Sequence, residues 1–215
     1  MSIRKQTLGE ELVNSITHGI GTALAIAATA VAIVWAAIYG NAYSIVSASV
    51  YGATLIILYL MSTLYHAFTG KTVKKVFRIF DHCSIFLLIA GTYTPMALVT
   101  LSGALGWTIF GIIWGFAVLG IVLNSISLEK FKVFSFICYI VMGWMIVIAT
   151  KRVIGEIGFY PAFFLLLSGG LAYTIGAIFY KMKNVKFMHG IWHLFVLLGS
   201  ILHYFCILFY VLPIK

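Results

Sequence analysis

Charged side chains are scarce in this sequence of 215 residues: they make up 9% of it, and Asp81 is the one aspartate. Hydrophobic residues supply 63% of the chain, and the mean hydropathy is +1.11. Because a soluble globular domain carries about 25% charged residues, this composition excludes that class and is typical of an integral membrane protein.

Cysteine is also sparse. Cys83, Cys138 and Cys206 lie singly within apolar segments, and their spacing excludes the paired-cysteine metal and redox motifs. Residues 1–19 contain charges and an amphipathic stretch in place of an apolar core with a small-residue cleavage site, so we expect no signal peptide. The first spanning helix is then expected to direct insertion.

Long apolar runs dominate the rest of the sequence. Since a spanning helix takes about 20 apolar residues, the runs predict an all-α membrane protein, a seven-transmembrane helix bundle. It forms one domain over residues 1–215, with no room for a separate soluble domain. The predicted spans are 14–38, 42–68, 79–101, 107–125, 133–150, 159–181 and 187–212.

The 14 lysines and arginines lie in the short connections around these runs and are distributed unevenly. Eleven of them fall on the side of the N-terminus, and only Lys151, Arg152 and Lys215 fall on the other side. By the positive-inside rule, the N-terminus is predicted to be cytoplasmic and the C-terminus outside. Because the charges do not follow one face, we assign the net charge of +9 to topology and expect no nucleic-acid partner.

Glycines recur where spanning helices would have to approach closely. They are Gly111 and Gly115 in the fourth run and Gly169, Gly170 and Gly176 in the sixth. Small residues let helix backbones come into contact within lipid, which predicts helix packing at both places. The alternative is that glycine is simply common in spanning helices.

Three histidines lie where the ends of apolar runs meet one side of the membrane. His66 ends the second run, and His189 and His193 begin the seventh, so all three are expected at the cytoplasmic leaflet. Histidines four residues apart share one helical face, with Cβ atoms about 5–6 Å apart. Three imidazoles that leave a fourth position open are the pattern of a catalytic zinc site. The alternatives are histidines that only hydrogen-bond between helices, or a structural or regulatory ion.

Asp81 and Ser62 are the candidate catalytic residues. Asp81 begins the third run at the level of the histidines and is predicted to orient or deprotonate a water whose pKa Zn²⁺ lowers to about 7. Ser62 lies one turn before His66 and is expected to hydrogen-bond a ligand histidine, that water or a developing oxyanion. No base accompanies Ser62 in the sequence, which argues against a serine nucleophile.

Other polar residues are candidates for supporting roles. Glu11, Asn14 and His18 are spaced as one face of the first helix, where they either cap the predicted site or belong to an amphipathic interfacial helix. His82 follows the aspartate directly and points about 100° away from it, so it is expected to be a supporting or interfacial group at most. His203 lies about 15 Å deeper than the predicted ligands, which predicts a role in packing or in lining a substrate cavity.

These residues belong to longer motifs. Glu11, Asn14 and His18 form ExxNxxxH, residues 90–95 read AGTYTP, and residues 169–180 read GGLAYTIGAIFY. With them, nearly the whole chain resembles the bacterial hemolysin III family. That family is similar to the progestin and adipoQ receptors and more distantly to the alkaline ceramidases, in a superfamily proposed to be metal-dependent membrane hydrolases.

The resemblance implies a seven-helix, multi-pass zinc protein of the bacterial inner (cell) membrane. The receptor pattern of SxxxH, Asp and HxxxH maps onto Ser62, His66, Asp81, His189 and His193, which implies that the histidines bind Zn²⁺ and that the aspartate holds the water on the metal. The chain lacks the long N-terminal region and C-terminal tail of the receptors, so partner binding through such extensions is not expected. The family name refers to cell lysis, which does not follow from the residues.

Three functions are compatible with the sequence. The first is a zinc-dependent hydrolase of lipid amide or ester bonds in membrane lipid homeostasis, with a ceramide-like or phospholipid acyl substrate that enters an apolar cavity from the bilayer. The second is a receptor or sensor in which zinc staples helices without turnover. The third is a pore-forming cytolysin, which would have to oligomerise. The sequence assigns neither the substrate headgroup nor the oligomeric state.

Overall fold

The computed structural model describes residues 6–214, so the basic residues Arg4, Lys5 and Lys215 lie outside the described part of the chain. Seven helices are long and apolar enough to cross a membrane, and no strand occurs among the described residues. The predicted all-α, seven-span architecture is confirmed. The elements are α1 (Leu8–Tyr39), α2 (Ala42–Ala67), α3 (Lys71–Pro95), η1 (Met96–Leu101), α4 (Gly103–Ile126), α5 (Leu128–Trp144), η2 (Met145–Ala149), α6 (Thr150–Ile157), η3 (Phe159–Phe163), α7 (Phe164–Lys181), α8 (Met188–Cys206) and η4 (Ile207–Val211).

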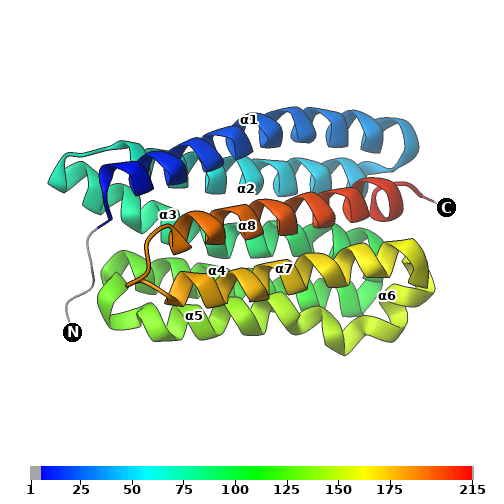
Figure 1. Ribbon diagram of the computed structural model, residues 1–215. Coiled ribbons are helices and arrows are strands. Elements are labelled where there is room, and N and C mark those ends of the chain that lie inside the picture. The colour runs from blue at the N-terminus through cyan, green and yellow to red at the C-terminus, as the bar shows by residue number, and fades with distance from the viewer. Residues whose placement is uncertain (1–5, 215) are drawn as a thin grey trace.

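The spans lie side by side in one bundle, with α1 and α2 along one side, α4 and α5 along the other, and α8 between α1 and α7 (Figure 1). α1 packs along α2, α2 along α3 and α7 along α8, and α8 closes the arrangement against α1. α3 is the most enclosed span: 67% of its apolar window is buried, against 22% for α1. The candidate residues of α2, α3 and α8 therefore lie in the interior of the bundle.

Four helices begin earlier than the apolar runs predict, and the differences are largest for α1 and α3. α1 begins at Leu8, where the Thr7 hydroxyl accepts a hydrogen bond from the Glu10 N–H and the Glu10 carboxylate accepts one from the Thr7 N–H. This capping box satisfies backbone donors without any apolar residue. α3 begins at Lys71 because its first turns are basic and need no contact with lipid. Asp81 consequently lies about 15 Å inside α3 and not, as predicted, at its beginning.

The glycine packing prediction is confirmed in α7, whereas in α4 the alternative holds, that glycine is simply common in spanning helices. A Cβ atom at Gly169 would collide with an imidazole of α8, and one at Gly176 would collide with aromatic side chains of α8. Gly170 is in ordinary contact with α5, at 3.9 Å. Gly111 and Gly115 face outward with nothing within 4 Å of the Cβ position, because they lie on the outer face of a peripheral helix. The helix pair α7 and α8 is therefore the one that the glycines hold in close contact.

α4 supplies a matched pair of glycines for a stability test. A Cβ atom at the buried Gly106 would collide with the backbone carbonyl oxygen of Ala97, which cannot swing aside as a side chain does, whereas Gly111 is open. We expect Gly106→Ala to lower the free energy of unfolding by about 1–3 kcal/mol and Gly111→Ala to change it by less than about 0.5 kcal/mol. Thermal unfolding of both variants in one detergent measures the difference, and equal melting temperatures would contradict the packing of α4 on η1.

Candidate metal centre

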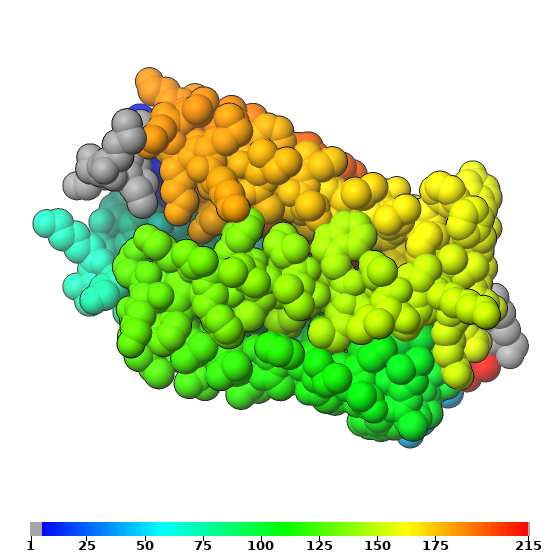
Figure 2. All heavy atoms as spheres, turned by 90° about the horizontal axis from the view of Figure 1, so that it is seen from below, coloured from blue at the N-terminus to red at the C-terminus, as the bar shows by residue number. Residues whose placement is uncertain are grey.

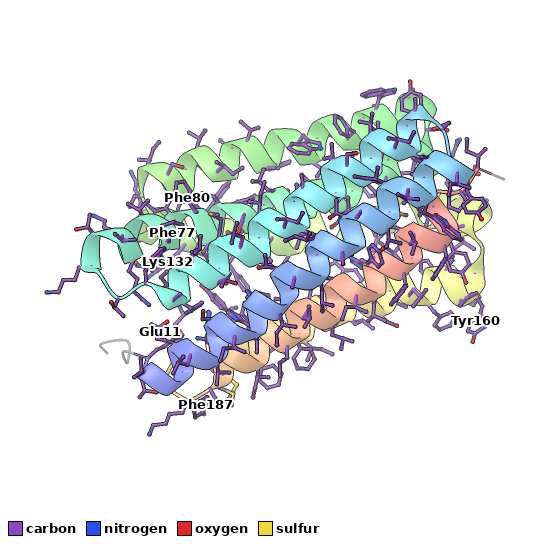
Figure 3. All side chains as sticks on the ribbon, turned by 90° about the horizontal axis from the view of Figure 1, so that it is seen from above. Glu11, Phe77, Phe80, Lys132, Tyr160 and Phe187 are labelled. Carbon is purple, nitrogen blue, oxygen red and sulfur yellow. The ribbon has the colours of Figure 1, made fainter. Side chains whose placement is uncertain are left out.

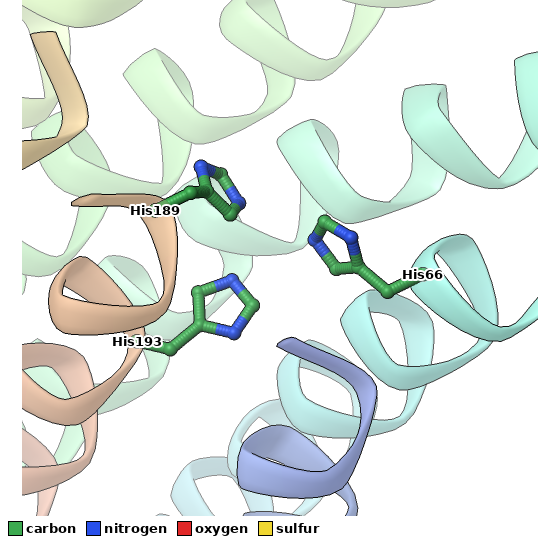
Figure 4. Close-up of side chains that lie close together, drawn as sticks. All are labelled: His66, His189 and His193. Atoms are coloured by element: carbon green, nitrogen blue, oxygen red, sulfur yellow. The ribbon is translucent and has the colours of Figure 1, made fainter. Parts of the chain in front are cut away.

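Three imidazoles converge at one end of the bundle. His66 is near the end of α2, and His189 and His193 lie on successive turns at the start of α8 (Figure 4). One ligand atom of each lies within 4.8 Å of the others, and the ring centroids are 4.7–5.1 Å apart. We refer to these three residues as the histidine cluster. The predicted convergence of residues far apart in sequence is confirmed.

The orientation of His66 is set by α1. Its Nδ1–H donates a hydrogen bond to the Glu11 carboxylate at 2.7 Å, and that carboxylate also accepts one from the Lys74 ammonium at 2.8 Å. The partner on Nδ1 assigns the proton to that nitrogen and leaves the lone pair on Nε2. His66 Nε2 is buried and has no hydrogen-bond partner.

His193 is held in the same way. Its Nδ1 lies 3.2 Å from the backbone carbonyl oxygen of Asn14 and 3.4 Å from the hydroxyl of Thr17, so Nδ1–H donates to α1 and Nε2 keeps its lone pair. The Asn14 amide also lies 3.5 Å from His66 Nδ1. Donation of the second ring nitrogen to a carboxylate or a backbone carbonyl is the usual way in which proteins orient a metal-binding histidine.

The histidine cluster fits a divalent transition metal. A buried nitrogen without a partner costs roughly 1–3 kcal/mol, and His66 Nε2 is such an atom, facing two further imidazoles. Three neutral imidazoles suit Zn²⁺, Cu²⁺, Fe²⁺ or Ni²⁺ better than the oxygen-preferring Mg²⁺ or Ca²⁺. The cluster has the donor set and the enclosure of a metal site.

Asp81 and Ser62, the predicted catalytic residues, lie on the neighbouring helices α3 and α2. The carboxylate of Asp81 lies 3.5 Å from Nδ1 of His82. Among the described residues, Asp81 is not part of the group whose ligand atoms converge. Ser62 is buried one turn before His66 on α2.

The polar face of α1 caps the cluster. Glu11 and Asn14 contact the ligand histidines directly, and His18 stacks on His193 with ring centroids 3.5 Å apart and planes at 10°. Both nitrogens of His18 are buried without a hydrogen-bond partner. Of the two interpretations left open by the sequence, the capping role fits these contacts, because an interfacial helix would not bury this face. Glu10 accepts a hydrogen bond from the N–H of Phe187 at 2.9 Å and so connects α1 to the segment before α8.

His82 connects the site to a residue that sequence reasoning missed. Its Nδ1–H donates to the carbonyl of Arg78 at 2.9 Å, and its Nε2 lies 3.5 Å from the hydroxyl of Tyr180. The ring of Tyr180 lies 5.9 Å from that of His189. The only signal for Tyr180 was its position at the end of the GGLAYTIGAIFY motif, which gives no information about its neighbours.

An apolar cavity of about 140 Å³ lies between α3, α5, α7 and α8. None of the three clustered histidines lines it, but it reaches Tyr180, whose ring lies 5.9 Å from that of His189. Tyr180, Phe136 and Trp192 line it near the cluster, and Trp144 and His203 line it deeper in the membrane. α5 and α7 meet along a seam on this side of the molecule (Figure 2). His203 Nε2–H also donates to the carbonyl of Leu166 at 3.0 Å, so the residue serves both predicted roles, packing and cavity lining.

The hydrogen bond from His66 to Glu11 generates a prediction. Glu11→Ala should weaken metal binding by about 10- to 100-fold, because the ligand imidazole loses the partner that fixes its orientation and tautomer. Glu129→Ala is the matched control, since Glu129 pairs with Arg78 at 2.7 Å on the exposed surface of the same end. Competition with a chelator of known affinity measures both. Equal metal affinities in the two variants would show that Glu11 does not support the site.

Comparison with known proteins agrees with the motifs. A family model described as Haemolysin-III related matches residues 6–204. Hemolysin-3 of Bacillus cereus is 47% identical over 213 residues, which cover 99% of this chain and 97% of that protein. The Hemolysin-3 homolog of Bacillus subtilis (strain 168) is 46% identical over 204 residues, 95% of each chain. Monocyte to macrophage differentiation factor of Homo sapiens is 29% identical over 209 residues, which cover 94% of this chain and 85% of that protein. The chain therefore belongs to the haemolysin-III-related family of multi-pass membrane proteins.

Proposed function

We propose that the chain is a zinc-dependent hydrolase that cleaves amide or ester bonds of lipids in the bacterial cell membrane. One observation carries the proposal: an apolar cavity begins at Tyr180, whose ring lies 5.9 Å from His189 of the histidine cluster. A polar reaction centre beside an apolar cavity, with Tyr180 between them, meets the two needs of lipid hydrolysis, activation of water and space for a hydrocarbon chain. The cavity runs within the membrane-spanning part of the bundle, where lipid is the solvent.

His66, His189 and His193 would hold the zinc ion. Bound there, Zn²⁺ would act as a Lewis acid toward a carbonyl oxygen and lower the pKa of water to about 7. Glu11 and Asn14 keep two of the imidazoles in the tautomer that binds a cation, through the hydrogen bonds at 2.7 and 3.2 Å. The burial of the cluster excludes bulk water, which strengthens every electrostatic interaction in it.

Asp81 is assigned the proton transfers. It lies on α3, which packs along α2, and its carboxylate is 3.5 Å from Nδ1 of His82, whose Nε2 in turn lies 3.5 Å from the hydroxyl of Tyr180. It takes the proton from the attacking water and returns it to the leaving nitrogen of an amide or the leaving oxygen of an ester. Ser62, buried on the preceding turn of α2, donates a hydrogen bond to the developing oxyanion or to a ligand histidine.

A non-catalytic receptor or sensor is the second candidate. The histidine cluster joins α2 to α8, and both ligand-bearing helices are hydrogen-bonded to α1, so an ion there would also staple three helices together. A pore-forming role follows only from the names of the Bacillus relatives. Leakage from liposomes that survives replacement of the histidines would identify it.

Replacing the ligand histidines tests the metal site. The purified chain should contain about one zinc ion, and His189→Ala and His193→Ala should each lose most of it, because two imidazoles bind far more weakly than three. His203→Ala is the matched control on the same helix, with its own hydrogen bond to Leu166. Elemental mass spectrometry gives the zinc content, and thermal unfolding confirms that all variants are folded. Retention of zinc by both ligand variants would refute the assignment.

Obstructing the cavity tests hydrolysis separately from metal binding. Gly143 lines the cavity and has nothing within 4 Å of its Cβ position, so Gly143→Phe fits the backbone while filling space that a hydrocarbon chain needs. If the new side chain displaces two methylenes of the lipid chain, the lost binding free energy is ~1.6 kcal/mol. Turnover of long-chain ceramides or phospholipids should then fall about tenfold. Zinc content should not change.

Gly115→Phe is the control for this substitution, because Gly115 is equally open but lies on the outer face of α4. It should retain turnover. If the wild-type protein binds zinc, is stabilised by it and hydrolyses none of these lipids, the receptor interpretation replaces the enzyme.

A further inference from the structure

Basic side chains cover the mouth of the cavity at the end where the histidine cluster lies. The Lys181 ammonium sits 4.2 Å from the ring centroid of Phe136, and the Lys183 ammonium sits 5.1 Å from that of Tyr180. Both rings line the cavity. Two positive charges are therefore held by cation–π contact on side chains that also face the space proposed for a lipid chain.

Two further cations stand beside Lys183. Arg78 lies 2.7 Å and Lys132 lies 3.9 Å from the carboxylate of Glu129. Partial burial of the Lys183 ammonium and then the charges of Arg78 and Lys132 lower the pKa of Lys183, and Glu129 acts in the opposite direction. Arg78 and Lys132 thus share one carboxylate, and Lys183 and Lys181 add two further positive charges nearby. We refer to Lys181, Lys183, Arg78 and Lys132 as the cation cluster.

Tyr180 lies between Lys183 of the cation cluster and His189 of the histidine cluster. The Lys183 ammonium contacts the ring of Tyr180, and the centroid of that ring lies 5.9 Å from that of His189 and 5.8 Å from that of Trp192. The Tyr180 hydroxyl lies 3.5 Å from Nε2 of His82. Figure 3 places Lys132 at the same end of the bundle as Glu11 and Phe187, with Tyr160 at the far end. An anion bound by these cations would lie next to both the histidines and the cavity.

We propose that the ligand of the cavity is an anionic glycerophospholipid, with its phosphate on the cation cluster and an acyl chain along the cavity. This proposal depends on the proposed function only for the identity of the lipid bond that is hydrolysed. Binding of the lipid itself requires no hydrolysis. Phosphate is the anion that clustered Lys and Arg side chains bind best. A neutral ceramide would leave the excess positive charge without a partner, which is why the charged lipid is favoured.

The dimensions of the cavity agree with an acyl chain. Its lining extends along α7 from Tyr180 to Gly170, ten residues, which corresponds to about 15 Å of helix, half of a hydrocarbon core of about 30 Å. At about 10–15 Å³ for each water-sized group, 140 Å³ accommodates about ten such groups. A lipid of the leaflet nearest the cation cluster could place its chain there without crossing the midplane.

The test measures lipid binding to the full-length, zinc-loaded protein in a neutral detergent. Probes are phosphatidylglycerol, phosphatidylcholine, a ceramide with matched acyl chains, and glycerol 3-phosphate, each titrated by its effect on the melting temperature. The variant combines Lys181→Ala and Lys183→Ala. Its control combines Lys71→Ala and Lys75→Ala, which remove the same charge at the start of α3, away from the cavity lining.

We expect phosphatidylglycerol to bind most tightly and its affinity to fall about tenfold or more in the Lys181/Lys183 variant, since each lysine near an anionic headgroup contributes about 1 kcal/mol. The Lys71/Lys75 variant should keep wild-type affinity. Equal losses in the two variants would show attraction to the general surface charge and would overturn the proposal. Ceramide binding as tight as that of phosphatidylglycerol, or glycerol 3-phosphate binding as tight as that of the whole lipid, would overturn it too.

The outcome is distinguishable from that of the proposed function. A protein that binds phosphatidylglycerol selectively through Lys181 and Lys183 but hydrolyses no lipid supports the ligand assignment and removes the hydrolase. A protein that hydrolyses lipids with no preference for anionic headgroups supports the hydrolase and removes the ligand assignment.

Discussion

The hydrogen bond between the His66 imidazole and the Glu11 carboxylate is the constraint on which the site depends. Within an apolar bundle, water is not available to satisfy a carboxylate or an imidazole, so each must find a partner in the protein. The contact of 2.7 Å joins α1 to α2, and the contact of His193 with the Asn14 carbonyl joins α8 to the same helix. Because both ligand imidazoles donate to α1 through Nδ1, their remaining nitrogens are left for a cation. The Nε2 atom of His66 is buried without a hydrogen-bond partner, and a bound cation would supply one.

The rest of the bundle keeps the site joined to lipid. Close packing of the glycines of α7 against α8 holds Tyr180 next to His189, whereas α5 and α7 contact each other sparingly and leave the cavity between them. The same tyrosine carries Lys183 on its ring. The histidine cluster, the apolar cavity and the positive charges therefore meet around one side chain, and this arrangement is the basis of the proposal that the site acts on a lipid.

The sequence predicts the architecture well because apolar runs correspond to helices within lipid and charged connections correspond to segments in water. It also predicts the histidine cluster. The HxxxH spacing places His189 and His193 on one helical face, and the alternating direction of the spans brings the end of the second and the start of the seventh to the same side, where His66 lies. It fails for Gly111 and Gly115, because a glycine pattern does not reveal which face of a helix meets a neighbour. The early start of α3 was missed because cationic helical turns resemble a loop in hydropathy. Tyr180 and the cation cluster depend on contacts between separate helices, which no local pattern encodes.

X-ray absorption at the zinc edge of the purified protein tests the central claim most directly. The account predicts three nitrogen neighbours at about 2.0–2.1 Å with the scattering signature of imidazole, together with a lighter oxygen contribution. A shell of sulfur neighbours near 2.3 Å, or no zinc bound to the folded protein, would contradict the assignment of His66, His189 and His193 as a metal centre.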